Sequence, residues 1–442
     1  MYRDLTKGSI SKGLVSFAVP MIAGNILQQF YNIADTLIVG RALGTEALAS
    51  VGSAYTLMTF LTSVFLGLSM GAGALFSIYY GKNDTQRLKQ SAALSFLLIM
   101  LVTVAINALV YAFANPILRF LQIPEELFFS MRQYLLIIFS GLIATSVYNY
   151  FACFLRAVGN SVTPLVFLGI STVMNIVLDI VFVIYLDFGI AGAAAATVFS
   201  QYVSGIGIMI YFVKSCKEFM PQKRHFKFDK AVFGEICDLS ALTCAQQSAM
   251  NFGILLIQRL VDSFGAVTMA AFAAAVKIDT LAYLPVQDFG NAFSTFAAQN
   301  YGAQNSERLK KGFGIATALS AAFSVVASVV VCVFAKPLMR LFINARETEV
   351  IACGVRYLRI EGAFYVGIGC LFLLYGFYRA LKRPSMSLIL TVISLGLRVA
   401  LAYILAPAIG ETGIWLAIPI GWFVADLVGY GYWFFRKAKL LG

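Results

Sequence analysis

Charged residues are scarce in this sequence: they make up 12% of 442 residues, whereas soluble domains carry about a quarter. Hydrophobic residues make up 60%, and the mean hydropathy is +0.83. A water-soluble core cannot hide so much apolar surface, so a soluble fold is excluded. The sequence predicts an integral membrane protein that crosses the bilayer many times.

Histidine and paired cysteines are also scarce, which limits the catalytic and metal-binding sites that the chain can form. The only histidine, His225, lies in a polar stretch, where we expect a solvated side chain. The seven cysteines form no CxxC pair and are typical of small packing residues in helices. HExxH, GxSxG and Walker motifs are absent as well. These absences argue against an enzyme and against a resident cofactor.

Apolar runs long enough to cross a bilayer recur along the whole chain. Alternating β patterns are lacking, so the runs are predicted to be helices, which satisfy their own backbone hydrogen bonds in lipid. Twelve spans are expected, at 14–40, 46–78, 85–114, 127–153, 160–186, 190–213, 232–261, 267–298, 308–335, 350–378, 384–406 and 412–435. The fold class is therefore all-α. We expect a six-helix lobe at 1–213, a basic linker at 214–230 and a second six-helix lobe at 231–442.

Basic residues are distributed unevenly between alternate loops. On the side of the N-terminus the loops hold 22 of the 33 lysines and arginines, and the opposite loops hold five. The positive-inside rule then predicts that both termini are cytoplasmic in a multi-pass protein of the cell membrane. Topology and contact with anionic lipid account for the net charge of +12, so no nucleic-acid partner is expected.

The two halves of the chain repeat one another at a spacing of 221 residues. YGKNDTQRLK (80–89) returns as YGAQNSERLK (301–310), and NPILRFL (115–121) returns as KPLMRLF (336–342). The matches keep loop charges, glycines and prolines in order, which a shared apolar composition does not supply. Both halves hold six spans and begin on the same side, so they are related by an axis along the membrane normal. Secondary transporters use such repeats to expose a central cavity alternately to the two sides.

Intramembrane polar residues gather in the first half. Four of them share one face of the first span: Asn25, Gln28, Asn32 and Asp35. The fifth span carries Asn175 and Asp179 one turn apart, and the sixth carries Thr197. A carboxylate at mid-span costs about 2.5–3.5 kcal/mol to insert, which makes it a functional candidate. Acids with amide and hydroxyl oxygens suit a small cation, and two close acids favour proton uptake. A polar clamp between helices is the structural alternative.

The second half has lost these acids at the matching positions, since Asp35 falls on Leu256 and Asp179 falls near Ala402. We therefore expect the coupling chemistry in the first half. Polar residues that could line a substrate cavity are Gln28, Asn32, Gln258, Lys277, Asp279, Gln287, Glu361 and Arg398. One alternative for them is an internal salt bridge between Lys277 and Asp279. Another joins Glu361 and Arg398.

Pro20 lies inside the first span, where it removes one backbone hydrogen bond and predicts a kink. A hinge that couples cation occupancy to the shape of the cavity is one interpretation. A static kink tolerated by neighbouring helices is the other.

The sequence resembles the multidrug and toxic compound extrusion (MATE) family of antiporters. FAVPMIAGNILQQFYNIADTLIVGRALGTEALASVG (17–52) looks like the first two helices of that family, and LRAVGNSVTP, NIVLD and GIAGAAAATV extend the similarity along the chain. The resemblance implies two six-helix lobes in a V and export of lipophilic, often cationic, small molecules in exchange for Na⁺ or H⁺. It also implies a cation site whose candidate Na⁺ ligands are Asp35, Asn175, Asp179 and Thr197. Tyr134 is implied as a neighbouring hydrogen-bonding residue. Some members place a carboxylate in the seventh helix, where this sequence has Gln258 and Arg259, which puts a second cation site in doubt.

Two other function classes stay open. A flippase for lipid-linked oligosaccharides has a related two-lobe architecture, but it would be expected to place several cationic side chains in its cavity for a diphosphate. A membrane-embedded transferase would need acidic metal motifs in a loop, and none is present. For the antiporter we expect drug-like cations and membrane lipids as partners of a monomer.

Overall fold

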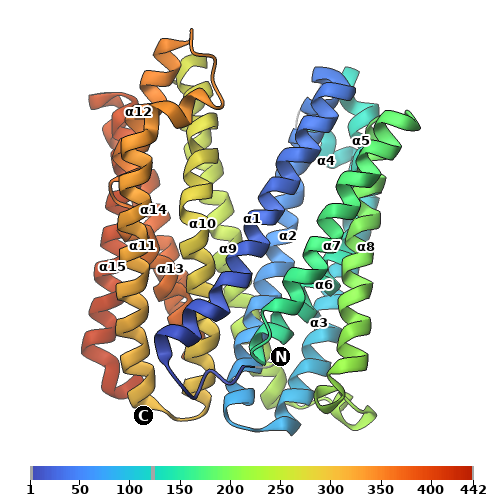
Figure 1. The fold of residues 1–442 in the computed structure, drawn as a ribbon, viewed down its shortest axis with the longest axis vertical. Helices are drawn as coiled ribbons and strands as arrows, with labels where there is room; N and C mark the ends of the chain where they lie inside the picture. The colour runs from blue at the N-terminus through green and yellow to red at the C-terminus, as the bar shows by residue number, and fades with distance from the viewer. Residues whose placement is uncertain (1–2, 121–124, 441–442) are drawn as a thin grey trace. The chain divides into compact units, whose positions relative to one another are not determined.

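The computed structural model describes residues 3–120 and 125–440, which form helices and turns without a strand. Figure 1 labels the elements along the chain. The α-helices are α1 (Ile10–Ala42), α2 (Gly44–Gly81), α3 (Thr85–Ala112), α4 (Ala114–Phe120), α5 (Glu125–Ser140), α6 (Leu142–Ala157), α7 (Val162–Asp179), α8 (Gly189–Ser215), α9 (Lys230–Asp262), α10 (Ala266–Gly302), α11 (Ser306–Arg340), α12 (Thr348–Gly362), α13 (Tyr365–Ala380), α14 (Pro384–Ile409) and α15 (Glu411–Leu440). The π-helical turn η1 (Ile180–Tyr185) follows α7, and the 3-10 turns η2 (Lys217–Phe219) and η3 (Lys223–Phe226) precede α9.

Every predicted span coincides with helical structure, and the boundaries agree to within a few residues. Ten helical segments in the described part of the chain are long and apolar enough to cross a membrane, and α12 with α13 makes an eleventh if the pair is one span. The prediction of an all-α membrane protein is therefore confirmed.

Two predicted spans are broken helices. The span at 127–153 consists of α5 and α6, which meet at Gly141, and the span at 350–378 consists of α12 and α13, which bend by 53° after Gly362. Gly141 and Gly362 are separated by the repeat distance, so the break belongs to both halves. The break is not predicted from the sequence, because each pair of helices reads as one span of suitable length.

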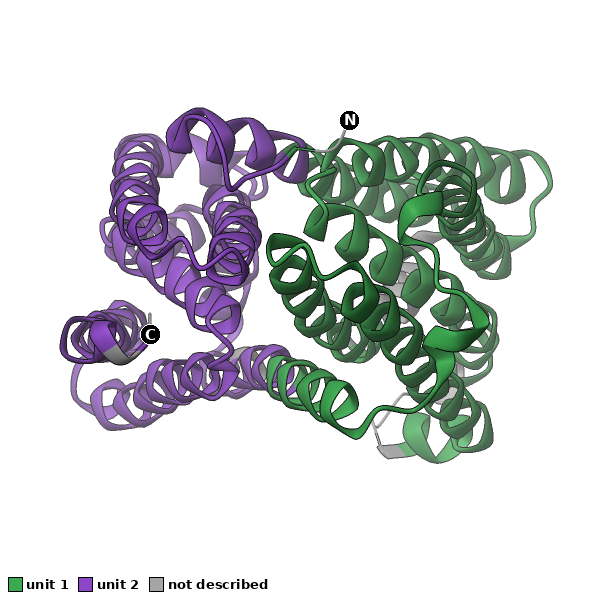
Figure 2. Cartoon of the chain, turned by 90° about the horizontal axis from the view of Figure 1, so that it is seen from below, with its two compact units in different colours: residues 1–3, 23–244 green, residues 4–22, 245–442 purple. Residues whose placement is uncertain are grey.

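The chain divides into two compact units (Figure 2). Unit 1 comprises residues 1–3 and 23–244, and unit 2 comprises residues 4–22 and 245–442. The division runs through two helices, since α1 contributes its start to unit 2 and α9 contributes its start to unit 1. Pro20 lies just before the point at which α1 passes from one unit to the other. The predicted lobes at 1–213 and 231–442 stay a prediction.

Unit 1 is held together by aromatic side chains between α2, α6 and α8. The ring of Phe154 lies 5.1 Å from that of Phe76 and 4.9 Å from that of Phe212, and all three are buried. The two helices α6 and α8 approach closely at Gly205, where a Cβ atom would stand 2.6 Å from the carbonyl oxygen of Ala144. A larger residue would force these helices apart.

Unit 2 has a corresponding core between α10, α11 and α13. The rings of Phe313 and Phe377 stack at 4.3 Å, and Trp433 of α15 packs on both. The backbones of α10 and α13 touch, because a Cβ atom on Gly376 would meet the carbonyl oxygen of Gly290. Glycine is required at this contact.

The repeat seen in the sequence is reproduced in backbone detail where α3 and α11 begin. Asn83 and Gln304 adopt left-handed backbone angles, with φ of 57° and 55°. The next residues, Asp84 and Asn305, cap the two helices by accepting hydrogen bonds of 3.0 and 3.1 Å from the amide three residues on. The carboxylate of Asp84 and the amide oxygen of Asn305 thus serve as equivalent N-caps in the two halves.

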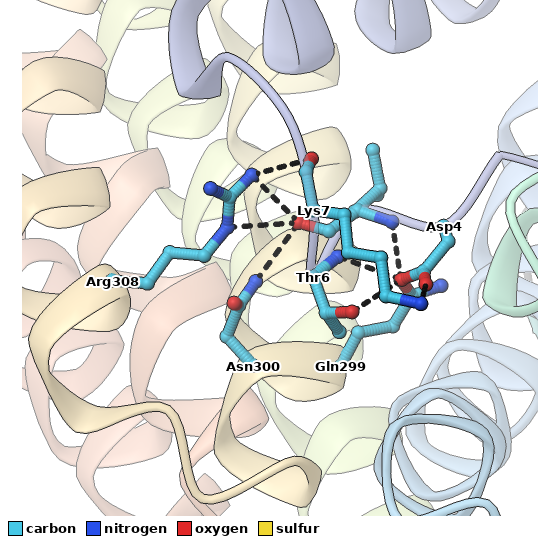
Figure 3. A network of polar contacts seen from close by, with 7 residues as sticks. Asp4, Thr6, Lys7, Gln299, Asn300 and Arg308 are labelled. Carbon is cyan, nitrogen blue, oxygen red and sulfur yellow. Dashed lines mark hydrogen bonds and ion pairs between the residues drawn. The ribbon is translucent and has the colours of Figure 1, made fainter.

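The segment before α1 is bound by the ends of α10 and α11 within unit 2 (Figure 3). The guanidinium group of Arg308 donates hydrogen bonds of 2.8–3.3 Å to the carbonyl oxygens of Leu5, Lys7 and Gly8. The backbone amide of Leu5 donates to Gln299, and its carbonyl oxygen also accepts from Asn300. Leu5 itself is buried.

The linker before α9 is bound in the same way by α3 within unit 1. His225 is buried there, so the expectation that it is solvated was wrong. Its Nδ1 accepts from the backbone amide of Gln222 at 2.9 Å; its Nε2 therefore carries the proton and donates to Gln86 at 2.9 Å. Gln90 adds a hydrogen bond to the carbonyl oxygen of Lys227. Each half of the sequence thus binds the segment that leads into the first helix of the other half.

Candidate functional site

Asp35 lies on the part of α1 that belongs to unit 1. Its side chain is half-buried, and its Oδ1 atom is enclosed. Of the polar residues predicted to share its face, Asn25 and Asn32 are half-buried and Gln28 is exposed. Asp35 thus places one enclosed carboxyl oxygen on a polar face that is otherwise only partly buried.

Asn175 and Asp179 lie one turn apart on the buried side of α7, with exposed fractions of 1% and 0%. The opposite side of the helix is apolar and exposed, at Val173 and Val177. Asp179 is the last residue of α7, and the chain continues directly into the π-helical turn η1. Such wider turns frequently occur at functional sites.

Thr197 of α8 joins α7 to α1. Its hydroxyl group accepts a hydrogen bond of 3.3 Å from the side-chain amide of Asn175 and lies 3.2 Å from the hydroxyl group of Tyr31. Tyr31 was not among the predicted site residues. It stands three residues after Gln28 and four before Asp35, so helical spacing alone would have placed it on the same face.

The carboxyl groups of Asp35 and Asp179 interact directly with each other. Tyr134 of α5 is buried beside them, within electrostatic reach of both acids and of Tyr31. The structure thus brings all five predicted coupling residues into one cluster, and every member belongs to unit 1.

Several oxygen atoms of the cluster are enclosed without a hydrogen-bond donor among the described residues. Apart from the contact between the two acids, four enclosed oxygens have no hydrogen-bond partner in the part of the chain that the structure describes: Asp35 Oδ1, Asn175 Oδ1, Asp179 Oδ1 and Asp179 Oδ2. None of the ion pairs between described residues involves either acid. Enclosed carboxylates without a counter-charge are strongly disfavoured. The set therefore fits a proton, which needs only the carboxyl groups, or a small cation such as Na⁺, which needs several oxygen ligands.

The predicted cavity residues of unit 2 differ in their burial. Asp279 and Glu361 are buried, Gln258, Gln287 and Arg398 are half-buried, and Lys277 is exposed. Gln258 donates a hydrogen bond of 2.7 Å to Asp262, at the end of α9. The structure therefore does not gather this set into one cluster.

Asp279 of α10 and Glu361 of α12 form a second acid pair, which the predicted bias toward the first half overlooked. The two carboxyl groups interact, the hydroxyl group of Tyr357 lies 3.5 Å from Asp279, and Arg398 is within electrostatic reach of both acids. Neither salt bridge considered from the sequence is among the ion pairs of the described residues. Lys277 points outward while Asp279 points inward, and the pairing of Glu361 with Arg398 is too loose to count as an ion pair.

Asp426 of α15 is a further enclosed carboxyl group that the sequence reasoning missed. It lies inside the predicted span at 412–435. The rule that singled out Asp35, that an acid within a span is a functional candidate, would have found it.

Comparison with known proteins gives sequence relatives over the whole chain. The family model described as MatE matches residues 20–181 and 243–404, once in each half. The probable multidrug resistance protein YpnP of Bacillus subtilis (strain 168) is 29% identical over 439 residues, which cover 99% of this chain and 98% of that protein. The probable multidrug resistance protein NorM of Thermotoga maritima is 24% identical, over 95% of this chain and 90% of that protein.

Solved structures show the same fold. A transporter of the MOP superfamily from Pyrococcus furiosus superposes with a TM-score of 0.93 at 24% identity, over 99% of this chain and 98% of that one. The outward-facing conformation of a multidrug resistance MATE family transporter gives the same TM-score and the same coverage at 23% identity.

Proposed function

The chain belongs to the MatE family of transporters, and on that premise we propose that it is a secondary antiporter. It exports lipophilic, often cationic, small molecules in exchange for Na⁺ or H⁺. The protein works by alternating access as a monomer in the cell membrane, with both termini in the cytoplasm.

One observation carries the proposal: the cluster of Asp35, Asn175, Asp179, Thr197 and Tyr134 in unit 1. Its acids have no counter-charge among the described residues and its enclosed oxygens have no partner. A polar clamp between helices, the structural alternative, would be expected to pair its donors and acceptors with each other. The unpaired oxygens support a site that takes up a positive charge from outside the protein.

The residues divide the work of coupling. Asp35 and Asp179 bind the positive charge, either as a proton that they share or as Na⁺ ligands. Asn175 and Thr197 supply neutral oxygens, which a proton does not need and Na⁺ does; this favours Na⁺, with protons competing for the same carboxyl groups. Each charge that moves inward down the membrane potential contributes about 2.3 kcal/mol per 100 mV, so either ion can drive export.

Alternating access needs the occupied and empty states of the cluster to prefer different conformations. α1 connects the cluster to unit 2, because it begins in unit 2, passes Pro20 and ends in unit 1. Neutralising Asp35 changes the polarity of one face of this helix. We propose that the change is relayed to unit 2 by bending at Pro20.

The names of the relatives support the substrate class without fixing the substrate. YpnP and NorM are named as multidrug resistance proteins, and another relative, MepA of Staphylococcus aureus, is named as a multidrug export protein. A relative from Shewanella oneidensis, 23% identical, is named as a FAD transporter. A polyanionic cargo is therefore the competing possibility, together with the lipid-linked oligosaccharide.

Dye uptake by everted membrane vesicles tests the proposal. The vesicles carry the full chain, and the uptake of ethidium, a lipophilic cation, is followed under an imposed Na⁺ gradient and, separately, an imposed H⁺ gradient. We expect uptake that collapses when the driving gradient is dissipated. Uptake that neither gradient affects would contradict ion coupling. If the vesicles take up no ethidium and instead transport a flavin nucleotide or a lipid-linked oligosaccharide, the proposed class of lipophilic cations is wrong.

A further inference from the structure

Asp426 is an enclosed carboxyl group of unit 2 that the proposed mechanism does not use. It lies near the middle of α15, is 7% exposed, and its Oδ1 atom has no hydrogen-bond partner in the part of the chain that the structure describes. The next residue, Leu427, is 74% exposed, so the enclosed face of α15 that carries Asp426 borders an exposed one. An enclosed carboxylate within a membrane span is disfavoured unless it is protonated or paired.

Groups that can exchange protons lie around Asp426. Gly367 of α13 lies beside it, since a Cβ atom there would stand in van der Waals contact with Oδ2 of Asp426, at 3.8 Å. Cys370, one turn further along α13, interacts with the hydroxyl group of Tyr430. That hydroxyl group lies 3.3 Å from the hydroxyl group of Thr317 on α11. A line of carboxyl, thiol and hydroxyl groups therefore runs from α15 to α11.

No basic side chain neutralises Asp426 among the described residues. The helices that contact α15 are α10, α11, α12, α13 and α14. The titratable or charged groups that they and α15 present to this region are Arg356, Cys370, Tyr375, Tyr378, Arg398 and Tyr430. Arg356 is bound to Glu411 at 3.0 Å, at the far start of α15. Arg398 packs against Gly421, more than a turn before Asp426. The negative charge of the carboxyl group must therefore be neutralised by something other than a basic side chain.

A row of hydroxyl groups on α11 leads away from this point. Four of them recur at helical spacing on one face: Thr317, Ser320, Ser324 and Ser328. The three serine hydroxyl groups are enclosed and have no hydrogen-bond partner among the described residues. Gly369 of α13 makes room for the row, because a Cβ atom there would stand 3.0 Å from the hydroxyl oxygen of Ser320 and closer still to that of Ser324.

The row ends near the second acid pair. Cys332 continues the same face of α11 one turn after Ser328, and it acts electrostatically on Tyr365. The hydroxyl group of Tyr365 is enclosed and is within electrostatic reach of Asp279 and Glu361. Protic side chains thus extend from Asp426 to the acid pair without leaving unit 2.

We propose that Asp426 is a proton-binding site and that the hydroxyl row of α11 is a hydrated path that connects it to the pair of Asp279 and Glu361. Enclosed polar groups that lack protein partners are where ordered water binds, and water fills the gaps between the hydroxyl groups. The ligand is a proton and not Na⁺, because one carboxyl group among hydroxyl groups offers too few oxygens to replace the hydration of Na⁺. The use of this proton in transport depends on the proposed function, whereas its binding does not.

Infrared spectroscopy of the full chain in lipid tests the binding site. A protonated carboxyl group has a carbonyl stretching band that a carboxylate lacks, and the spectrum is titrated from mildly acidic to mildly alkaline pH. We expect Asp426→Asn, which preserves the shape of the side chain, to remove one such band that titrates in the wild type. Asp262→Asn, at the exposed end of α9, is the matched control and should leave the band in place. Equal carboxyl bands in the wild type and Asp426→Asn at every pH would overturn the site.

Hydrogen exchange of the same band tests the path. After transfer to D₂O the carboxyl band shifts as its proton is replaced. We expect the double variant Ser324→Ala, Ser328→Ala to slow this shift several-fold, because two hydroxyl groups of the row are gone. The control is the double variant Val325→Ala, Val329→Ala, which changes the exposed neighbours on the same helix. An equal rate in the two double variants would overturn the path. Neither measurement needs a transported substrate, so its failure is distinct from a failure of the antiport assay.

Discussion

The side-chain amide of Asn175 donates a hydrogen bond of 3.3 Å to the hydroxyl group of Thr197, which joins the end of α7 to α8 beside Asp179. The carbonyl oxygen of the same amide remains enclosed without a partner among the described residues. The amide donor of Asn175 is thus satisfied within the cluster, whereas its carbonyl oxygen and the enclosed carboxyl oxygens stay available as acceptors. This is the arrangement expected of a site for a positive charge.

Asp35→Asn and Asp179→Asn should each reduce gradient-driven dye efflux to the level of vesicles without the protein. The change keeps the shape of the side chain and removes the charge that binds the ion, so expression and detergent stability should stay near those of the wild type. Efflux and thermal stability are measured in parallel. Asp187→Asn is the matched control, because Asp187 lies in the exposed turn after η1. Wild-type efflux by both site variants would remove the cluster from the mechanism.

Thr197→Ala should weaken the dependence of transport on Na⁺ and spare transport driven by protons alone. The variant deletes one neutral oxygen, which Na⁺ needs in place of lost hydration and a proton does not. Efflux is measured as a function of Na⁺ concentration at fixed pH. Thr197→Ser retains the hydroxyl group and should restore the wild-type dependence. Transport by the wild type that ignores Na⁺ at every pH would leave protons as the driving ion.

Glu361→Gln should alter the rate or the range of transported dyes more than the coupling, and so should Gln258→Ala. Glu361 pairs with Asp279 in unit 2, whereas Asp35 and its cluster belong to unit 1. The ratio of ions to dye moved is measured for each variant beside Asp35→Asn. If Glu361→Gln uncouples transport as completely as Asp35→Asn, the coupling site is shared between the two units.

Docking of the linker on α3 should weaken in acid because of His225. Burial first, and then the nearby charges of Arg224 and Lys89, lower the pKa of His225 below 6.5. The docked linker needs the neutral ring, whose Nδ1 accepts that hydrogen bond. Docking is therefore fully stable above the unfolded pKa of about 6.5 and is lost as the pH falls through the lower folded value.

Hydrogen exchange of the backbone amides in residues 217–229, read by mass spectrometry, measures this docking. Exchange should rise several-fold between neutral and mildly acidic pH, after correction for the intrinsic pH dependence of exchange. His225→Gln keeps a side chain that can hydrogen-bond and cannot titrate in this range, so its corrected exchange should not respond to pH. The same corrected response in His225→Gln would show that another group controls the linker.

Arg308→Ala should release the segment before α1. The guanidinium group donates to three carbonyl oxygens of that segment, and a hydrogen bond from a charged donor contributes about 1.5–3 kcal/mol when it is shielded from water. Because the group is partly exposed, we expect a loss of about 1–2 kcal/mol in the local opening free energy. Hydrogen exchange at residues 5–9 measures it. Arg87→Ala changes the repeat counterpart, whose side chain is 57% exposed and pairs with Asp84, and should leave residues 5–9 protected.

Helix positions followed from the sequence because a long apolar run in lipid has few alternatives. The polar residues that meet in unit 1 could also be picked out, since Asp35 and Asp179 are conspicuous in apolar surroundings; their role in coupling stays a prediction. The breaks at Gly141 and Gly362 were not predicted, because a glycine within a span is common in membrane helices.

The polar contacts of unit 2 were harder to predict because they are long-range. Asp279 and Glu361 come from two different helices, and their pairing depends on packing that local spacing does not encode. The same applies to His225, whose partner Gln86 is 139 residues away. Polar composition suggested a solvated linker, and tertiary contact with α3 overrode it.

The hydrogen bond between Leu5 and Arg308 joins residues that are 303 positions apart in the chain. A ribosome adds about 5–20 residues per second, so roughly 15–60 s pass between the synthesis of the first segment and that of its partner. During that interval the carbonyl oxygens of Leu5, Lys7 and Gly8 lack the guanidinium group that binds them. The segment made first is thus among the last to reach its final place, and assembly is completed by the return of the beginning of the chain to a helix made much later.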